Sequence, residues 1–152
     1  MTSVLGAGGP PPTRGDSSAL AEIESRLRHA LAGEPVVRWA YLFGSAARGE
    51  AFRDVDVAVM LRETARGAVA LGRVAASIER AAAPFRVDVV DLIAAAPVLA
   101  GRIVREGRVL VDTDCESRRT WEVDANGRAL DIEPWLAEFE RLRNEALRRR
   151  AG

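Results

Sequence analysis

The chain has 152 residues, of which 48% are hydrophobic and 29% charged, so it is long enough for one ordinary domain with a hydrophobic core and too short for two. Its 22 basic and 22 acidic residues balance. A neutral chain has no overall electrostatic attraction to nucleic acid or to a membrane surface, and we expect neither as a partner. The single cysteine, Cys115, excludes a disulfide within the chain and a cysteine-based zinc site.

The N-terminal 16 residues are rich in glycine and proline, which predicts a disordered leader. They lack the basic start and the apolar core of a secretion signal. No other part of the sequence is apolar over the length that is needed to cross a bilayer. We therefore expect a cytoplasmic protein.

Helices and strands follow the leader in a mixed order. Ser17 or Ser18 can cap a first helix that ends at Gly33. Its apolar residues recur at helical spacing and predict a buried stripe of Leu20, Ile23, Leu27 and Leu31. The next elements are expected, in chain order, as a strand at 36–43, a strand at 55–61, a helix at 63–82, a strand at 85–92, a helix at 97–106 and an edge-type strand at 108–111.

The tail of the chain predicts one more helix, which starts at Glu133 or Pro134. One face of that helix is apolar and carries Trp135, Phe139, Leu142 and Ala146. The opposite face alternates glutamate with arginine, which is typical of a solvated surface. Trp121 and Trp135 could anchor a partner protein, but packing against the parent domain is the commoner role for such residues.

This order of elements predicts a single domain of the α/β or α+β class at 17–114, followed by a C-terminal helical extension at 115–152. The connection between the first two strands has an unusual composition. The stretch FGSAARGEAFRDVDV, residues 43–57, places a Gly-Ser turn, an arginine and two aspartates between two apolar strands.

The Gly-Ser turn and the arginine are suited to binding phosphate. Gly44 lets the backbone approach a ligand without a Cβ in the way, and the hydroxyl of Ser45 adds a hydrogen-bond donor. Arg48 supplies a permanent charge and a planar set of donors that match phosphate oxygens. A Gly-Ser pair by itself is more often a plain tight turn, so the assignment depends on the aspartates that follow.

Asp54 and Asp56 lie two residues apart at the start of the second strand, so both side chains project from the same face. The intervening and following valines, Val55, Val57 and Val59, then face the core. Two adjacent carboxylates repel each other unless a cation neutralises them. Mg²⁺ prefers such oxygen ligands together with substrate phosphates.

A third carboxylate, Asp88, lies in the middle of the 85–92 strand. If that strand lies beside the second one, Asp88 can join Asp54 and Asp56. Three acids on two neighbouring strands are enough to hold two ions about 4 Å apart, as in two-metal phosphoryl-transfer sites. Asp91 competes for this role, but it points to the other face of the strand and lies at its end, so we favour Asp88.

Taken together, FGSAARGE, DVDVAV and VDVVDL resemble the motifs of the DNA polymerase β-like nucleotidyltransferase superfamily: GS-x-x-RG, then D-x-D, then a later aspartate on a neighbouring strand. The resemblance covers about 17–112, and the small size is similar to that of the minimal nucleotidyltransferases. The stretch VDVVDLIAAAPVLAGRIVREGRVLVD is also similar to the corresponding part of MntA-type antitoxins, which are partners of HEPN-domain toxins. The segment RRTWEVDANGRALDIEP resembles, more loosely, the helices that follow this domain in the family. The resemblance implies a palm-like mixed sheet with helices on one face.

The resemblance also implies roles for the motif residues. Gly44, Ser45 and Arg48 would bind the triphosphate of ATP. Asp54 and Asp56 would bind both of two Mg²⁺ ions, and Asp88 would bind one of them and help to activate the attacking hydroxyl. The implied reaction is the transfer of AMP from ATP to a tyrosine of a HEPN toxin, within a hetero-oligomer of toxin and antitoxin.

The sequence departs from the family pattern just before Asp54. Family members usually have a serine directly before the first aspartate and a loop that is about two residues longer. Here Arg53 takes the place of the serine, and only four residues separate Gly49 from Asp54. A degenerate member that binds its partner without catalysis is therefore an alternative. Transfer of a nucleotide to a small hydroxyl compound such as an aminoglycoside is another, although the tail of about 40 residues is small for the acceptor domain of such enzymes.

Overall fold

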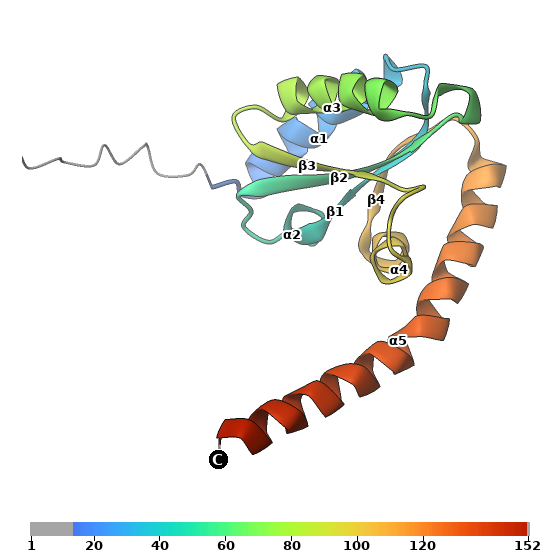
Figure 1. The fold of residues 1–152 in the computed structure, drawn as a ribbon. Coiled ribbons are helices and arrows are strands. Elements are labelled where there is room, and N and C mark those ends of the chain that lie inside the picture. Colours follow the sequence, from blue (N-terminus) through green and yellow to red (C-terminus); the bar gives the residue numbers. More distant parts are fainter. Residues whose placement is uncertain (1–13, 152) are drawn as a thin grey trace, which may run out of the picture.

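Four strands form one mixed sheet in the order β3-β2-β1-β4 in the computed structural model, which describes residues 14–151 (Figure 1). The central strand β1 is antiparallel to both of its neighbours, and β2 is parallel to β3. The elements are, in chain order, α1 (Ser17–Ala32), β1 (Val37–Phe43), α2 (Gly44–Ala47), β2 (Asp54–Leu61), the 3₁₀ turn η1 (Glu63–Ala65), α3 (Ala68–Ala82), β3 (Arg86–Asp91), α4 (Pro97–Glu106), β4 (Arg108–Asp112) and α5 (Cys115–Ala151).

Helix α1 is capped by Asp16, and not by Ser17 or Ser18 as the sequence suggested. The Asp16 carboxylate accepts hydrogen bonds from the backbone N–H groups of Ser18 and Ala19, both at 3.0 Å. Aspartate is as good an N-cap as serine, and the helix simply begins one residue after it. The expectation of a disordered leader falls mostly on residues 1–13, which lie outside the described residues. Gly15, the residue before the cap, pairs with Phe52 through two backbone hydrogen bonds of 2.8 and 3.2 Å.

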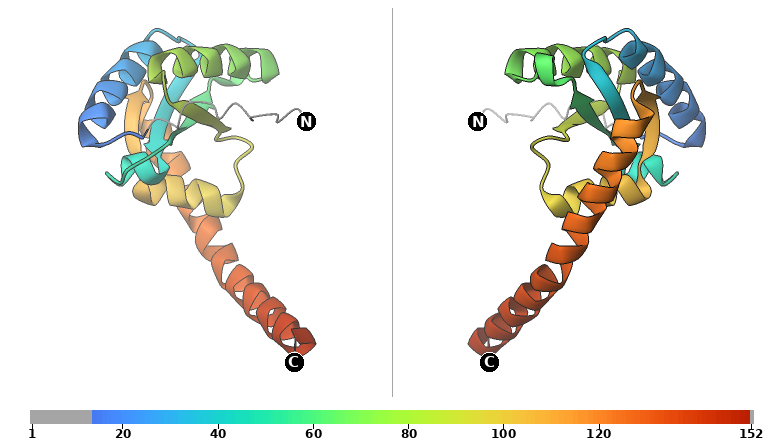
Figure 2. Two further views of the ribbon diagram at one scale, coloured as in Figure 1. Left: turned by 90° about the vertical axis from the view of Figure 1, so that its left-hand side faces the viewer. Right: turned by 90° about the vertical axis from the view of Figure 1, so that its right-hand side faces the viewer.

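Helices α1 and α3 cover one face of the sheet (Figures 1 and 2). The predicted stripe of α1 is confirmed, since Leu20, Ile23, Leu27 and Leu31 are all buried. They pack with Val74 and Ile78 of α3 and with the inward-facing valines of β2, namely Val55, Val57 and Val59. Burial of these side chains supplies most of the driving force for folding this layer.

The opposite face of the sheet carries a second buried cluster around Trp39, Tyr41 and Met60. Helix α4 and the first part of α5 cover it, through Ile103 of α4 and Trp121 of α5. The expected α+β fold with a mixed sheet and a C-terminal helical tail is confirmed. The structure adds that helices lie on this second face as well.

Two predicted helices have different bounds in the structure. The helix expected at 63–82 is interrupted, because Gly67 has a φ of +143°, which separates the 3₁₀ turn from α3. The last helix begins at Cys115, about 18 residues before the expected start, and runs through Pro134. A proline inside a helix removes a hydrogen bond and crowds the preceding turn. Here the packing of the first half of α5 on the domain offsets this cost, with Ala125 and Ala129 buried.

Helices α4 and α5 pack closely. A side chain at Gly101 of α4 would collide with Ala129 of α5, so the glycine sets how closely the two helices approach. Arg105 of α4 forms an ion pair of 2.8 Å with Glu133 of α5. None of the helices within residues 14–151 is both long and apolar enough to span a bilayer.

Candidate active site

The register between β2 and β3 places the predicted carboxylates next to one another. Asp56 is aligned with Asp88 across the two parallel strands, and Asp54 lies two residues before Asp56 on the same face. All three line one pocket of about 360 Å³. Asp91 is absent from that lining and is aligned with Val59, a core-facing residue. Its carboxylate accepts a hydrogen bond of 3.0 Å from the N–H of Ile93, in the turn after β3.

The Gly-Ser turn lies against the same carboxylates. Phe43, the last residue of β1, is aligned with Asp56, and Gly44 follows it with a φ of +73°. A Cβ at Gly44 would collide with the Asp56 carboxylate, so only glycine allows this close approach. Ser45 is half-buried and lines the pocket together with the three aspartates. The structure therefore brings Ser45, Asp54, Asp56 and Asp88 together, with the backbone of Gly44 beside them.

The electrostatics of the pocket centre on Asp56. Its half-buried position and the nearby charges of Asp88 and Asp54 raise the pKa of its carboxyl above the ordinary value, while the positive charge of Arg48 partly opposes that rise. The ionised form of Asp56 is thus held in an unfavourable environment in the absence of a cation. This is the condition that binding of a divalent ion relieves.

Arg48, which the sequence assigned to phosphate binding, is not among the residues that line the pocket. Its side chain is exposed. The guanidinium donates to both carboxylate oxygens of Glu50, at 2.8 and 3.3 Å, and to Glu106 of α4 at 3.3 Å. A phosphate would have to compete with these two acids for the arginine.

Two other arginines, which sequence reasoning did not assign, line the pocket instead. Arg53 directly precedes Asp54. Arg14 directly precedes Gly15, whose backbone hydrogen bonds to Phe52 hold this part of the chain beside the loop between α2 and β2. The sequence could have indicated that Arg53 lines the pocket, because it directly precedes the first aspartate. Arg14 had no such signal, because it depends on a backbone pairing between residues far apart in sequence.

The carboxylates of the pocket are oxygen donors of the type that binds hard divalent cations. Three carboxylates on two adjacent strands offer hard oxygen ligands, and the pKa of Asp56 is raised first by its burial and then by the charges of Asp88 and Asp54. As the side chains stand, no three Asp, Glu, His or Cys residues within 14–151 are gathered closely enough to ligate one metal ion. Asp54 and Asp88 are exposed, so rotation about their side-chain bonds can bring their oxygens toward Asp56.

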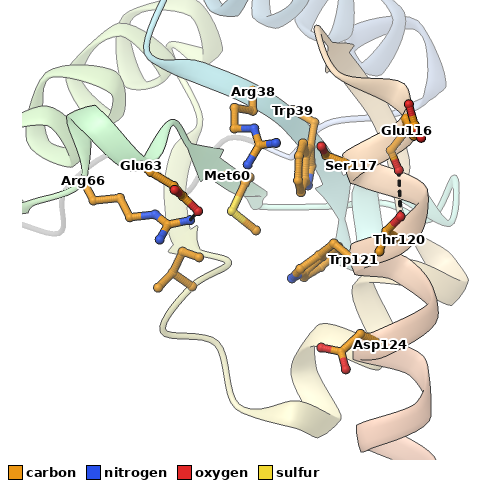
Figure 3. A pocket seen from close by; sticks show the side chains of 11 residues that line it. Arg38, Trp39, Met60, Glu63, Arg66, Glu116, Ser117, Thr120, Trp121 and Asp124 are labelled. Carbon is orange, nitrogen blue, oxygen red and sulfur yellow. Dashed lines mark hydrogen bonds and ion pairs between the residues drawn. The ribbon is translucent and has the colours of Figure 1, made fainter.

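A larger hollow of about 670 Å³ lies farther along the same face of the sheet (Figure 3). Trp39 of β1 and Met60 of β2 form its floor, Glu63 and Arg66 lie on one side, and Trp121 of α5 lies on the other. Met60 is four residues after Asp56 on β2, which corresponds to roughly 13 Å along the strand. The two hollows therefore open on one face at opposite ends of the strand.

The start of α5, which borders this larger hollow, is held in place by a polar network. Tyr41 of β1 donates a hydrogen bond of 2.6 Å to Glu122, and Arg118 forms ion pairs with Asp112 at 2.8 Å and with Glu122. Burial and the hydrogen bond to Glu122 raise the pKa of the Tyr41 hydroxyl. Tyr41 therefore stays protonated and continues to donate at physiological pH.

Comparison with known families identifies the domain. Residues 25–116 match the profile of the family described as polymerase beta, nucleotidyltransferase. Comparison with curated protein sequences gives no match.

Several solved structures share the fold. A chain of the Shewanella oneidensis complex of tri-AMPylated HEPN toxin with MNT antitoxin is 24% identical, with a TM-score of 0.58, and the match covers 84% of the present chain and 98% of that one. A chain of an MntA–HpeT toxin–antitoxin complex with two aspartate-to-glutamate substitutions is 23% identical, with a TM-score of 0.59 and coverage of 82% and 98%. A protein described as a minimal nucleotidyltransferase is 30% identical, with a TM-score of 0.51 and coverage of 62% and 95%.

Proposed function

Because the chain belongs to the polymerase beta nucleotidyltransferase family, we propose that it is a Mg²⁺-dependent enzyme that transfers AMP from ATP to a tyrosine hydroxyl of a cognate HEPN toxin. The observation that carries the proposal is the alignment of Asp56 with Asp88 in a pocket that also contains Asp54 and Ser45. We further propose that residues 17–114 perform the transfer, that 115–152 form an extension, and that the protein acts in the cytoplasm.

The residues of the pocket would divide the work as follows. Asp54 and Asp56 would hold two Mg²⁺ ions and Asp88 one of them, and bound Mg²⁺ would neutralise charge on the phosphates of ATP during transfer. Gly44 and Ser45 would hold the triphosphate, since the turn lies directly against Asp56.

The acceptor would approach from the side of β3. This strand is at the edge of the sheet, and Asp88 on it is exposed, so an incoming hydroxyl can reach that carboxylate. Asp88 would then accept the hydroxyl proton as the oxygen attacks the α-phosphorus of ATP. The bond from the α-phosphorus to the bridging oxygen breaks and pyrophosphate leaves.

The choice of partner rests on similarity. The sequence around the third aspartate resembles that of MntA-type antitoxins, and the fold neighbours include complexes of toxin with antitoxin, one of which contains an AMPylated HEPN toxin. In one neighbour the two substituted aspartates are two positions apart, which is the spacing of Asp54 and Asp56. A further neighbour is a toxin–antitoxin structure with AMP-PNP, an analogue of ATP.

The test is transfer of labelled AMP to a purified candidate HEPN toxin in the presence of ATP and Mg²⁺, with mass spectrometry to identify the modified residue. Asp88→Asn should abolish transfer. Asp91→Asn is the matched control, because this aspartate lies on the same strand but outside the pocket, and it should retain activity. Equal loss in both variants, or no loss in either, would contradict the assignment of Asp88.

A non-catalytic binding antitoxin is the second candidate, and the position of Arg48 favours it. The arginine that would bind phosphate is held by Glu50 and Glu106 instead. Calorimetric titration with ATP separates the two candidates, because a pure binding protein would show no affinity for ATP that depends on Mg²⁺.

A further inference from the structure

The second half of α5 has no packing partner. From Pro134 to Arg150, a segment that we call the α5 arm, every residue is exposed except Glu145, which is half-buried. Figures 1 and 2 show that the arm extends away from the sheet and its helices. Large apolar side chains are nevertheless present on it, with Trp135 79% exposed and Phe139 65% exposed. Exposure of such residues in a row is typical of an interaction surface.

The apolar residues of the arm follow a heptad pattern. Trp135, Phe139, Leu142 and Ala146 are separated by four, three and four residues, which corresponds to alternating d and a positions of a coiled coil. Ile132, just before the arm, occupies the preceding a position. The apolar stripe therefore extends over about two heptads, which is the pattern of a helix that packs lengthwise against another helix.

The charged residues beside the stripe indicate which helix that is. Glu138 and Glu145 occupy g positions, and Arg143 and Arg150 occupy e positions. In a parallel pair of identical helices, each g residue faces the e residue five positions later on the other helix. Glu138 of one copy then faces Arg143 of the other, and Glu145 faces Arg150. In an antiparallel pair, g faces g and e faces e, which would bring glutamate to glutamate and arginine to arginine.

We propose that two copies of this chain associate through the α5 arm as a parallel coiled coil. The apolar stripe provides the contact, and the g and e charges select a second copy in parallel orientation. Arg141, at a c position, forms ion pairs with Glu138 and Glu145 of its own helix, so in the pair each glutamate would be shared between Arg141 and the e-position arginine of the other copy. Because the stripe spans only about two heptads, we expect a weak dimer, and the dimeric fraction should therefore rise with protein concentration.

Sedimentation velocity of the full-length protein over a range of concentrations tests the proposal. Leu142→Ala and Leu147→Ala form a matched pair, since both leucines are similarly exposed on the arm, at 51% and 56%, but only Leu142 lies in the stripe. Leu142→Ala should weaken association at least tenfold, or about 1.4 kcal/mol. Leu147→Ala should change it by less than about twofold. A wild-type protein that is monomeric at every concentration, or equal effects of the two variants, would overturn the proposal.

Charge exchange tests the orientation. Glu138→Arg and Arg143→Glu should each weaken association, and the double variant should restore it, because the exchanged charges again attract in a parallel pair. In a Cys115→Ala background, Ala146→Cys should form a disulfide-linked dimer under mild oxidation, since parallel pairing places identical a positions face to face. No rescue together with no cross-link would refute the parallel pair. Protection of the arm from proteolysis only after a HEPN protein is added would identify the toxin as its occupant and would also refute self-association.

Discussion

Replacing Asp56 by asparagine is expected to stabilise the protein in the absence of metal. Asp56 is aligned with Asp88 and lies two residues from Asp54, and its carboxyl has a raised pKa because of burial and the charges of these two neighbours. Asparagine keeps the shape and removes the charge. Relief of like-charge repulsion between adjacent strands is worth roughly 0.2–1 kcal/mol, which raises the Tm of a protein of this size by up to about 4 °C.

The pH dependence of this difference follows from the direction of the shift. A carboxyl with a raised pKa binds its proton more tightly in the folded state, so the free energy of unfolding falls as pH rises from the ordinary value of 3.8 through the pKa of the folded state. The wild type carries the full cost above that window and none of it below. The stability gap between Asp56→Asn and wild type should therefore be present at neutral pH and disappear below about pH 3.8.

Thermal unfolding monitored by circular dichroism, in the presence of a chelator and at several pH values, measures this gap. Adding Mg²⁺ with ATP at 100 times the dissociation constant should then stabilise the wild type by about 2.7 kcal/mol and the variant by much less. Two results would refute the reasoning: a variant less stable than wild type at neutral pH without metal, or equal stabilisation of both proteins by Mg²⁺ and ATP.

Three further changes probe the Gly-Ser turn, the arginines near the pocket and the start of α5. Gly44→Ala should lower both Tm and ATP affinity, because alanine is strained at a φ of +73° and its Cβ would displace the Asp56 carboxylate; calorimetry and thermal unfolding measure the two losses. Arg53→Ala should raise the KM for ATP more than Arg48→Ala does, because Arg53 lines the pocket and Arg48 does not, and steady-state kinetics of AMP transfer compares them. Asp114→Ala should destabilise the protein at neutral pH, because Asp114 accepts a hydrogen bond from the first turn of α5 and pairs with Arg38, which lowers the pKa of its carboxyl to about 2. In urea titrations, the difference in free energy of unfolding between variant and wild type should shrink as pH falls from about 4 to about 2.

The strands and the carboxylates were predictable from sequence because strand geometry is local. Alternation of side chains along β2 put Asp54 and Asp56 on one face and the valines in the core, and the structure agrees. Local pattern could not predict which strand pairs with β2. Asp88 reaches the pocket only because β3 pairs with β2 in parallel, and the crossover through α3 permits this pairing.

Two differences between sequence and structure depend on contacts between distant parts of the chain. Pro134 favoured a helix start, but the packing of α5 on α4, where Gly101 meets Ala129, sustains a helix well before it. Arg48 matched a phosphate-binding motif, but the end of α4 brings Glu106 within reach of its guanidinium. Such pairings join residues far apart in sequence, and no local periodicity encodes them.

The position of the site follows from how far the second face of the sheet is covered. Along β2 on this face, Met60 and Ala58 are buried in the cluster that Ile103 of α4 and Trp121 of α5 join, Asp56 is half-buried, and Asp54 is exposed. The face thus changes from apolar to acidic where the helical cover ends. A cation at this boundary would contact a carboxylate whose charge is only partly screened by water, while ATP could still enter from solvent. The same partial burial that raises the pKa of Asp56 would strengthen its attraction to the ion, so the cost to the folded state and the affinity for metal have one physical origin.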